Sequence, residues 1–164
     1  MAIDSPNYST LTAMITPALF MTATGSLIIS TSNRMSRIVD RIRQLNDQGD
    51  SLSRGKVDLD FPAVRLDHIA AQLESLLTRS NRIRQALTLL YLALALFVGT
   101  SLTTAIHVLI GSDVLALPTA LAIGGVSLLL LASVQLTREA HTALGGNRLE
   151  IDFYKDLRRR RASG

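Results

Sequence analysis

The residues best suited to chemistry lie along one face of a predicted first helix. At about 100° per residue, six positions between residues 12 and 30 fall close to one line, and three arginines continue it. These positions are Thr12, Thr16, Leu19, Ala23, Ser26, Ser30, Arg34, Arg37 and Arg41. A pore-lining helix needs hydroxyls to solvate ions, one large apolar side chain at a constriction and charge at the mouth. The face therefore predicts an ion channel lined by this helix.

The same helix also fits close packing. Ala18, Thr22, Ser26 and Ser30 form a ridge of small side chains at i+4 spacing. Such ridges let transmembrane helices approach closely, and Ser and Thr hydroxyls bond their own backbone. Two functions therefore stay open: a homo-oligomeric channel, or a non-catalytic scaffold or accessory subunit of a larger membrane complex.

Other chemical sites are not predicted. The chain has no Cys, and its three His residues lie on three different segments. It has no glycine-rich phosphate loop and no cluster with metal-ligand spacing. The Ser and Thr residues of the first helix have no partnered base to activate them. We expect no enzymatic activity, no cofactor, no metal and no nucleic-acid partner.

His107 is the single ionisable residue inside a predicted membrane span. An ionisable group in the bilayer is a functional candidate, which makes His107 a candidate proton sensor. It lies near the outer end of its span, six residues before Asp113. The alternative is an interfacial or hydrogen-bonded structural role.

The elements that position these residues are helices that cross a membrane. All 17 Lys and Arg residues lie in two blocks, 34–84 and 138–161, separated or flanked by long uncharged runs. About 20 apolar residues are enough to span a bilayer. The pattern predicts an all-α membrane protein with three spans at about 12–33, 86–110 and 116–137. Because basic residues stay inside, both basic blocks should be cytoplasmic and the N-terminus outside.

The cytoplasmic residues 34–84 are predicted to form an antiparallel helical hairpin. Met35, Ile38, Ile42 and Leu45 recur at helical spacing. A heptad pattern follows on the second arm at Leu66, Ile69, Leu73, Leu76, Ser80, Ile83, Leu87 and Leu90. The alternative is that each arm packs on other subunits.

The ends of these helices are predicted from turn residues. Residues 46–61 are polar with two glycines and predict a loop between the arms. The first helix either kinks at Pro17 or begins there. Gly145 and Gly146 are predicted to end the third helix, which divides the chain into a membrane domain, 1–144, and a basic cytoplasmic tail, 145–164.

The expected partners are the bilayer and other copies of the chain. Three spans bury little surface against one another, so we expect self-association into a homo-oligomer. The tail carries Arg158, Arg159, Arg160 and Arg161, which would bind anionic lipids of the inner leaflet. A solvated tail that helps to hold the topology is the alternative.

The stretch ITPALFMTATGSLIISTSNRMSRIVDRIRQL, Ile15 to Leu45, resembles the opening signature of a family of short bacterial integral membrane proteins. That family is a domain of unknown function with three predicted spans. The likeness extends more loosely to about Thr137. It implies a multi-pass protein of the bacterial inner membrane, and it supplies no activity, ligand or site.

Overall fold

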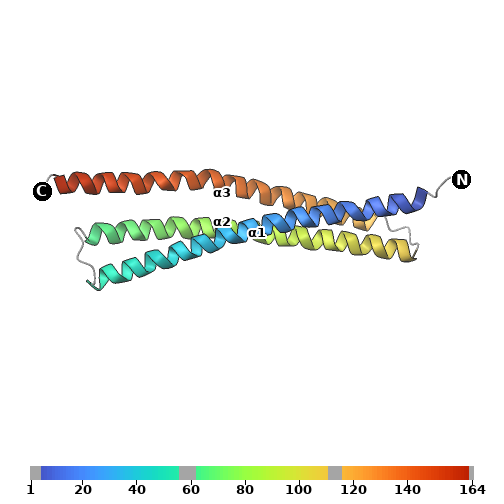
Figure 1. Ribbon diagram of the computed structural model, residues 1–164, viewed down its shortest axis with the longest axis horizontal. Helices are drawn as coiled ribbons and strands as arrows, with labels where there is room; N and C mark the ends of the chain where they lie inside the picture. Colours follow the sequence, from blue (N-terminus) through green and yellow to red (C-terminus); the bar gives the residue numbers. More distant parts are fainter. Residues whose placement is uncertain (1–4, 56–61, 111–115, 163–164) are drawn as a thin grey trace. The chain divides into compact units, whose positions relative to one another are not determined.

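The computed structural model describes residues 5–55, 62–110 and 116–162, with side chains described for 15–55, 62–107, 109 and 116–141. The described chain consists of three helices: α1 (Ser5–Ser53), α2 (Pro62–Ile110) and α3 (Ala116–Ala162) (Figure 1). Each includes a stretch long and apolar enough to cross a membrane. The expectation of an all-α chain with three long apolar helices is confirmed.

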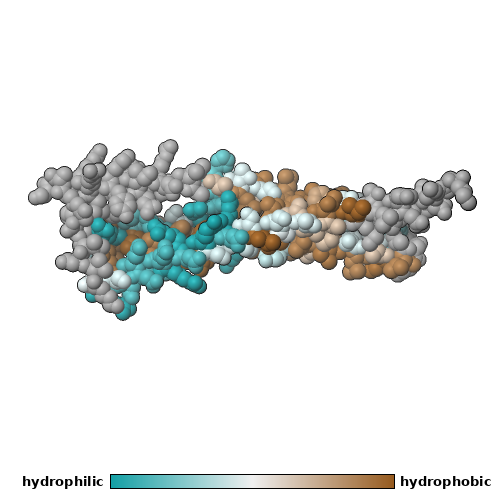
Figure 2. Space-filling model, in the orientation of Figure 1, coloured by the Kyte–Doolittle hydropathy of each residue, from teal (hydrophilic) through white to brown (hydrophobic). Residues whose placement is uncertain are grey.

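The chain divides into two compact units, and each helix contributes to both. The first unit comprises residues 1–32 and 85–134, and the second comprises 33–84 and 135–164. The division falls where the uncharged runs of the sequence meet its basic blocks. On the face shown in Figure 2, the described surface of the first unit is mostly hydrophobic and that of the second mostly hydrophilic.

Aromatic side chains and glycine pack together in the first unit. The Phe20 and Phe97 rings stack with centroids 5.2 Å apart and planes 13° from parallel. Gly125 of α3 lies against the Phe97 ring, because a Cβ built at Gly125 would be 2.7 Å from Cε1 of Phe97. Glycine is needed at this position because α3 approaches the ring too closely for a methyl group. Phe97 is 1% exposed, whereas Phe20 is half-buried, so Phe97 is the enclosed member of the stack.

The outside of the first unit is mostly apolar among the described residues. Leu109 is 83% exposed, and large aliphatic side chains of all three helices are more than half exposed, including Ile29, Leu102 and Leu130. A water-soluble protein rarely exposes an apolar surface of this extent, whereas a bilayer favours it. Two glycines of α2 and α3 allow packing inside the unit, since Gly99 lies near Leu121 and Gly124 near Leu96.

The second unit has an aliphatic core. Ile38, Leu45 and Ile83 are buried at 7%, 2% and 1% exposure. The Ser80 hydroxyl donates to Sδ of Met35 at 3.5 Å. All described heptad positions of α2 in this unit are half-buried or buried, whereas Leu77, outside the heptad, is 58% exposed. The heptad therefore marks the contact face of α2.

The predicted loop at 46–61 is wrong for its first half, because α1 continues to Ser53. Leu45, Gly49 and Leu52 continue the spacing of the covered face, so most of the polar residues between them lie on the exposed face. The helix ends at Ser53, and Gly55 lies in the turn that follows it. Its φ of 66° suits glycine, and its N–H donates to the Leu52 carbonyl at 3.2 Å. Residues 56–61 lie outside the described part.

The structure decides two other helix ends. Of the two alternatives for the first helix, a start at Pro17 is excluded, because α1 starts at Ser5 and includes that proline. Gly145 and Gly146 do not end α3, which continues to Ala162. A glycine inside a helix costs about 1 kcal/mol relative to alanine but does not stop it. Residues 147–162 are rich in Leu, Lys and Arg, which favour helix, so the segment predicted as a separate tail extends α3.

Candidate functional site

The predicted pore-lining face of α1 is exposed in the single chain. Thr16, Leu19, Ala23, Ser26 and Ser30 are all exposed, with Leu19 at 66%. The side chain of Thr12 lies outside the described residues. The opposite side of α1 carries the buried residues Pro17, Thr24, Ile28 and Thr31. Within the first unit, α1 therefore packs through its other face, and the small hydroxylated face is left uncovered.

Several hydroxyls on or beside this face bond the backbone of their own helix. Thr22 Oγ1 donates to the Ala18 carbonyl and Ser26 Oγ to the Thr22 carbonyl, each at 3.1 Å. On the covered side, Thr24 Oγ1 donates to the Phe20 carbonyl at 2.7 Å. Such bonds satisfy a hydroxyl where water is absent. The hydroxyl oxygens keep lone pairs that can still accept a bond from water or contact a cation.

The three predicted mouth arginines have different surroundings. Arg34 is half-buried and donates from Nη1 to Glu139 of α3 at 3.4 Å. Arg41 is half-buried and donates to Oε1 of Gln44 at 3.5 Å. Arg37 is exposed, and among the described side chains no hydrogen bond or ion pair of its guanidinium is found. Of these three arginines, only Arg37 has no carboxylate or amide partner among the described side chains.

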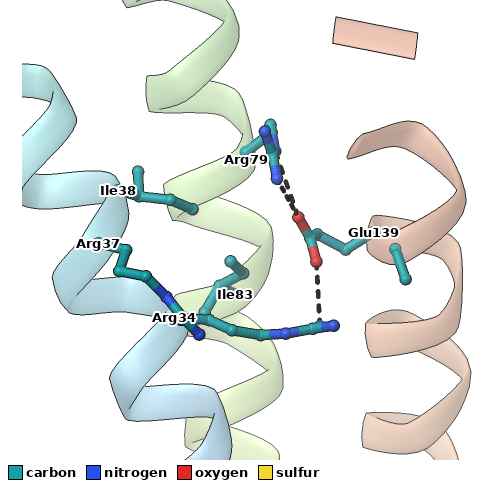
Figure 3. Close-up of a pocket in the computed structure, with 7 residues that line it drawn as sticks. Arg34, Arg37, Ile38, Arg79, Ile83 and Glu139 are labelled. Atoms are coloured by element: carbon teal, nitrogen blue, oxygen red, sulfur yellow. Dashed lines mark hydrogen bonds and ion pairs between the residues drawn. The ribbon is translucent and has the colours of Figure 1, made fainter. Parts of the chain in front are cut away.

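Glu139 is the centre of a charge cluster in the second unit (Figure 3). Its side chain is 4% exposed, and its two oxygens accept from arginines of the other two helices. Oε1 accepts from Nε and Nη2 of Arg79 at 3.2 and 3.0 Å, and Oε2 accepts from Arg34 at 3.4 Å. A buried carboxylate is tolerated only when paired and hydrogen-bonded in this way. The cluster therefore ties α1, α2 and α3 together.

A cavity of about 230 Å³ adjoins this cluster. Arg34, Arg37 and Arg79 line it together with Glu139, and its apolar wall includes Ile38 and Ile83. Three guanidiniums and one carboxylate give the cavity a net charge of +2 (three positive, one negative). Arg79 is 27% exposed at its side chain and Arg34 42%, so both charges are partly desolvated.

Sequence reasoning missed Glu139 and Arg79. The signal was present: Glu139 is the first acidic residue after the third apolar run, and Arg34 is the first charged residue after the first. One carboxylate among arginines at the start of a basic block predicts an ion pair. The topology rule counts only Lys and Arg in these blocks. An acidic residue within a block, such as Glu139, therefore receives no attention when the rule is applied.

His107 is half-buried near the end of α2 in the first unit. Its Nδ1 atom is buried and has no hydrogen-bond partner within the described part of the chain. The structure thus brings no second ionisable group to the candidate proton sensor among the residues described. Over the same residues, no group of three or more His, Asp or Glu side chains is placed to hold a metal ion. The side chains of Arg158 to Arg161 lie outside the described residues.

The sequence matches a family model over residues 14–149, and the family is described as "Protein of unknown function (DUF2721)". The chain belongs to this family. The match covers the resembling stretch and all three apolar helices, which confirms the resemblance found in the sequence. No curated protein and no solved structure matches the chain. Membership agrees with a small multi-pass membrane protein, and the function must be argued from the residues themselves.

Proposed function

We propose that the protein is an ion channel of the bacterial inner membrane, formed by several copies whose α1 helices surround a central path. The observation that supports this proposal most strongly is the exposed face of α1. Thr16, Ala23, Ser26 and Ser30 are small or hydroxylated, and they lie uncovered on a helix long and apolar enough to span a bilayer. Lipid gains little from such a face, whereas a narrow hydrated path uses its hydroxyls and its small side chains.

The proposed path has a constriction and a charged mouth. Leu19 is the single large apolar side chain on this face within the span, so a ring of Leu19 residues would narrow the path and exclude water. Arg37 and Arg41 continue the face beyond the span. The charge of Arg34 is offset by Glu139, so the mouth charge comes mainly from Arg37 and Arg41. Rings of arginine concentrate anions and repel cations, which favours anion conduction.

The proposed topology places the N-terminus outside and the second unit in the cytoplasm. All 17 Lys and Arg residues belong to the segments 34–84 and 138–161, and basic segments next to spans are retained inside. The second unit would then be a cytoplasmic antiparallel hairpin with the end of α3 beside it. Two contacts in opposite order along the arms support the hairpin: Ser80 with Met35, and Ile69 with Gly49.

A scaffold function is the second candidate, and the backbone-bound hydroxyls favour it. Thr22 and Ser26 donate to carbonyls of α1 itself, which is the arrangement a dry helix interface uses. In this alternative the exposed face of α1 packs on a helix of another membrane protein, and no path forms. The two candidates differ in whether α1 meets other copies of itself.

Cysteine cross-linking tests this difference, because the chain contains no native Cys. Ser26→Cys places a thiol on the exposed face. Thr24→Cys is the matched control, because it places a thiol about half a helical turn away, at a position with 0% exposure. In native membranes treated with an oxidant or a short bis-maleimide, we expect Ser26→Cys to give covalent dimers of the chain and Thr24→Cys to give none. Absence of dimers with Ser26→Cys, together with cross-links to other proteins, would favour the scaffold.

A further inference from the structure

The cavity beside Glu139 has the composition of an anion site. Its three guanidiniums come from two helices, Arg34 and Arg37 from α1 and Arg79 from α2. Guanidinium groups match the oxygens of phosphate through paired N–H donors. The cavity's net charge of +2 suits a group that carries one or two negative charges. Such a site requires guanidiniums that are held in place and retain unused donors.

Glu139 holds two of the guanidiniums in place and leaves some of their N–H donors unused. It fixes Arg79 through two hydrogen bonds and Arg34 through one. Because each guanidinium has five N–H donors, both keep donors that the carboxylate does not use. Glu139 neutralises only one of the three positive charges. Holding the side chains in advance reduces the ordering cost that a ligand would otherwise meet.

Arg37 is the open contact of the cavity, that is, the lining guanidinium that no described side chain already binds. It is exposed, and no partner of its guanidinium is found among the side chains that the structure describes. It lies one helical turn beyond Arg34 on α1, so the two guanidiniums line the cavity from the same helix (Figure 3). An anion bound here would pair with Arg37 first and would share the remaining donors of Arg34 and Arg79.

The size and walls of the cavity limit the ligand. Pockets that enclose drug-sized molecules start at about 300 Å³, and this cavity holds about 230 Å³. Ile38 and Ile83, at 7% and 1% exposure, form an apolar wall that strengthens charge interactions. A single phosphate group fits these limits, whereas a complete nucleotide is too large to be enclosed.

We propose that this cavity binds one phosphate group, through Arg37, Arg34 and Arg79. The group could belong to a phospholipid or to a free phosphate in solution. The lipid source follows from the proposed membrane placement: Arg34 is the first residue after the uncharged run 5–33, and Ile83 lies two residues before the run 85–112. These positions correspond to the level of the phospholipid headgroups. The site itself requires neither a ring of subunits nor ion conduction.

The test compares two arginine variants of the full-length chain. Arg37→Gln removes the open contact, and Arg82→Gln removes the same charge from an exposed position outside the cavity lining. Neither change touches the pairs of Glu139, so both variants should retain the thermal stability of the parent. In one arm, native mass spectrometry in detergent counts bound phosphatidylglycerol against phosphatidylcholine. In the other, equilibrium dialysis measures binding of labelled inorganic phosphate in phosphatidylcholine nanodiscs.

We expect Arg37→Gln to weaken binding at least about tenfold, since hydrogen bonds to charged groups contribute about 1.5–3 kcal/mol. Arg82→Gln should weaken it less than about twofold. Selective binding of phosphatidylglycerol identifies a lipid as the source, and binding of inorganic phosphate identifies a free phosphate. If neither probe binds, or if the two variants weaken binding equally, the proposal is wrong. These readouts are independent of ion flux and cross-linking, so they separate this site from the proposed channel.

Discussion

Glu139→Ala is expected to lower the free energy of unfolding by about 2–3 kcal/mol, one of the two largest effects we predict. Removing one partner of a buried ion pair typically costs about 3–5 kcal/mol, because the other charge is left unpaired. Arg34 and Arg79 retain 42% and 27% side-chain exposure and can partly rehydrate, which reduces the expected loss. For a chain of this size, the melting temperature should fall by about 5–10 °C.

The measurement is thermal denaturation in detergent, combined with limited trypsin digestion of the second unit, where all the Lys and Arg residues lie. Glu74→Ala is the matched control, since Glu74 is exposed on α2 and should lose less than about 0.5 kcal/mol. The double variant Arg79→Gln/Glu139→Gln should lose less than the sum of its single variants, because the two residues interact. Equal melting temperatures for Glu139→Ala and Glu74→Ala would show that the cluster does not hold the helices together.

Gly125→Ala is the second change with a large expected effect, in the first unit. The added methyl group would lie 2.7 Å from Cε1, 3.0 Å from Cδ1 and 3.1 Å from Cζ of Phe97. Phe97 cannot turn away easily because it is 1% exposed and stacked on Phe20. Overpacking of this kind costs about 1–3 kcal/mol. The loss should appear as a lower melting temperature in detergent.

Other glycines provide matched controls for this substitution. At Gly25 a Cβ meets nothing within 4 Å, and at Gly124 its nearest contact is the flexible end of Leu96 at 3.2 Å. Gly25→Ala should be neutral or should stabilise α1 by up to about 1 kcal/mol, because alanine favours helix. Gly124→Ala should fall between the two. Adding Phe97→Leu to Gly125→Ala should recover part of the loss, and a failure to do so would locate the strain elsewhere.

Much of the helical architecture could be predicted from the sequence. The uncharged runs give three long apolar helices, and the expected third span begins at Ala116, the first residue of α3. The heptad of α2 correctly predicts which side is covered, since Ile83 and Leu90 are buried. Periodicity succeeds here because burial on a helix repeats every 3.6 residues, whatever partner covers it.

Helix ends and specific contacts could not be predicted in the same way. Gly49 and Gly145 are glycines of the kind that often mark turns, yet both lie inside helices. Gly49 packs on the covered face of α1, and the residues after Gly145 favour helix. Gly124 and Gly125 are adjacent glycines that the sequence does not distinguish, but the tightest contact is at Gly125. It depends on where the Phe97 ring lies, which is a property of the packed helices. Glu139 is similar: its role depends on arginines 60 and 105 residues away.

The most direct test of the proposed ion path is flux through liposomes that contain Leu19→Ser. Leu19 and Leu130 are both 66% exposed, but Leu19 lies on the proposed lining face of α1 and Leu130 lies on α3. The two substitutions therefore remove the same apolar area from water or lipid. With equal amounts of protein in each preparation, we measure chloride release from loaded liposomes. If α1 lines the path, Leu19→Ser raises the leak several-fold above the parent chain, whereas Leu130→Ser leaves it unchanged. Equal leak from the two variants, or no leak above empty liposomes for either, would contradict the proposed ion path.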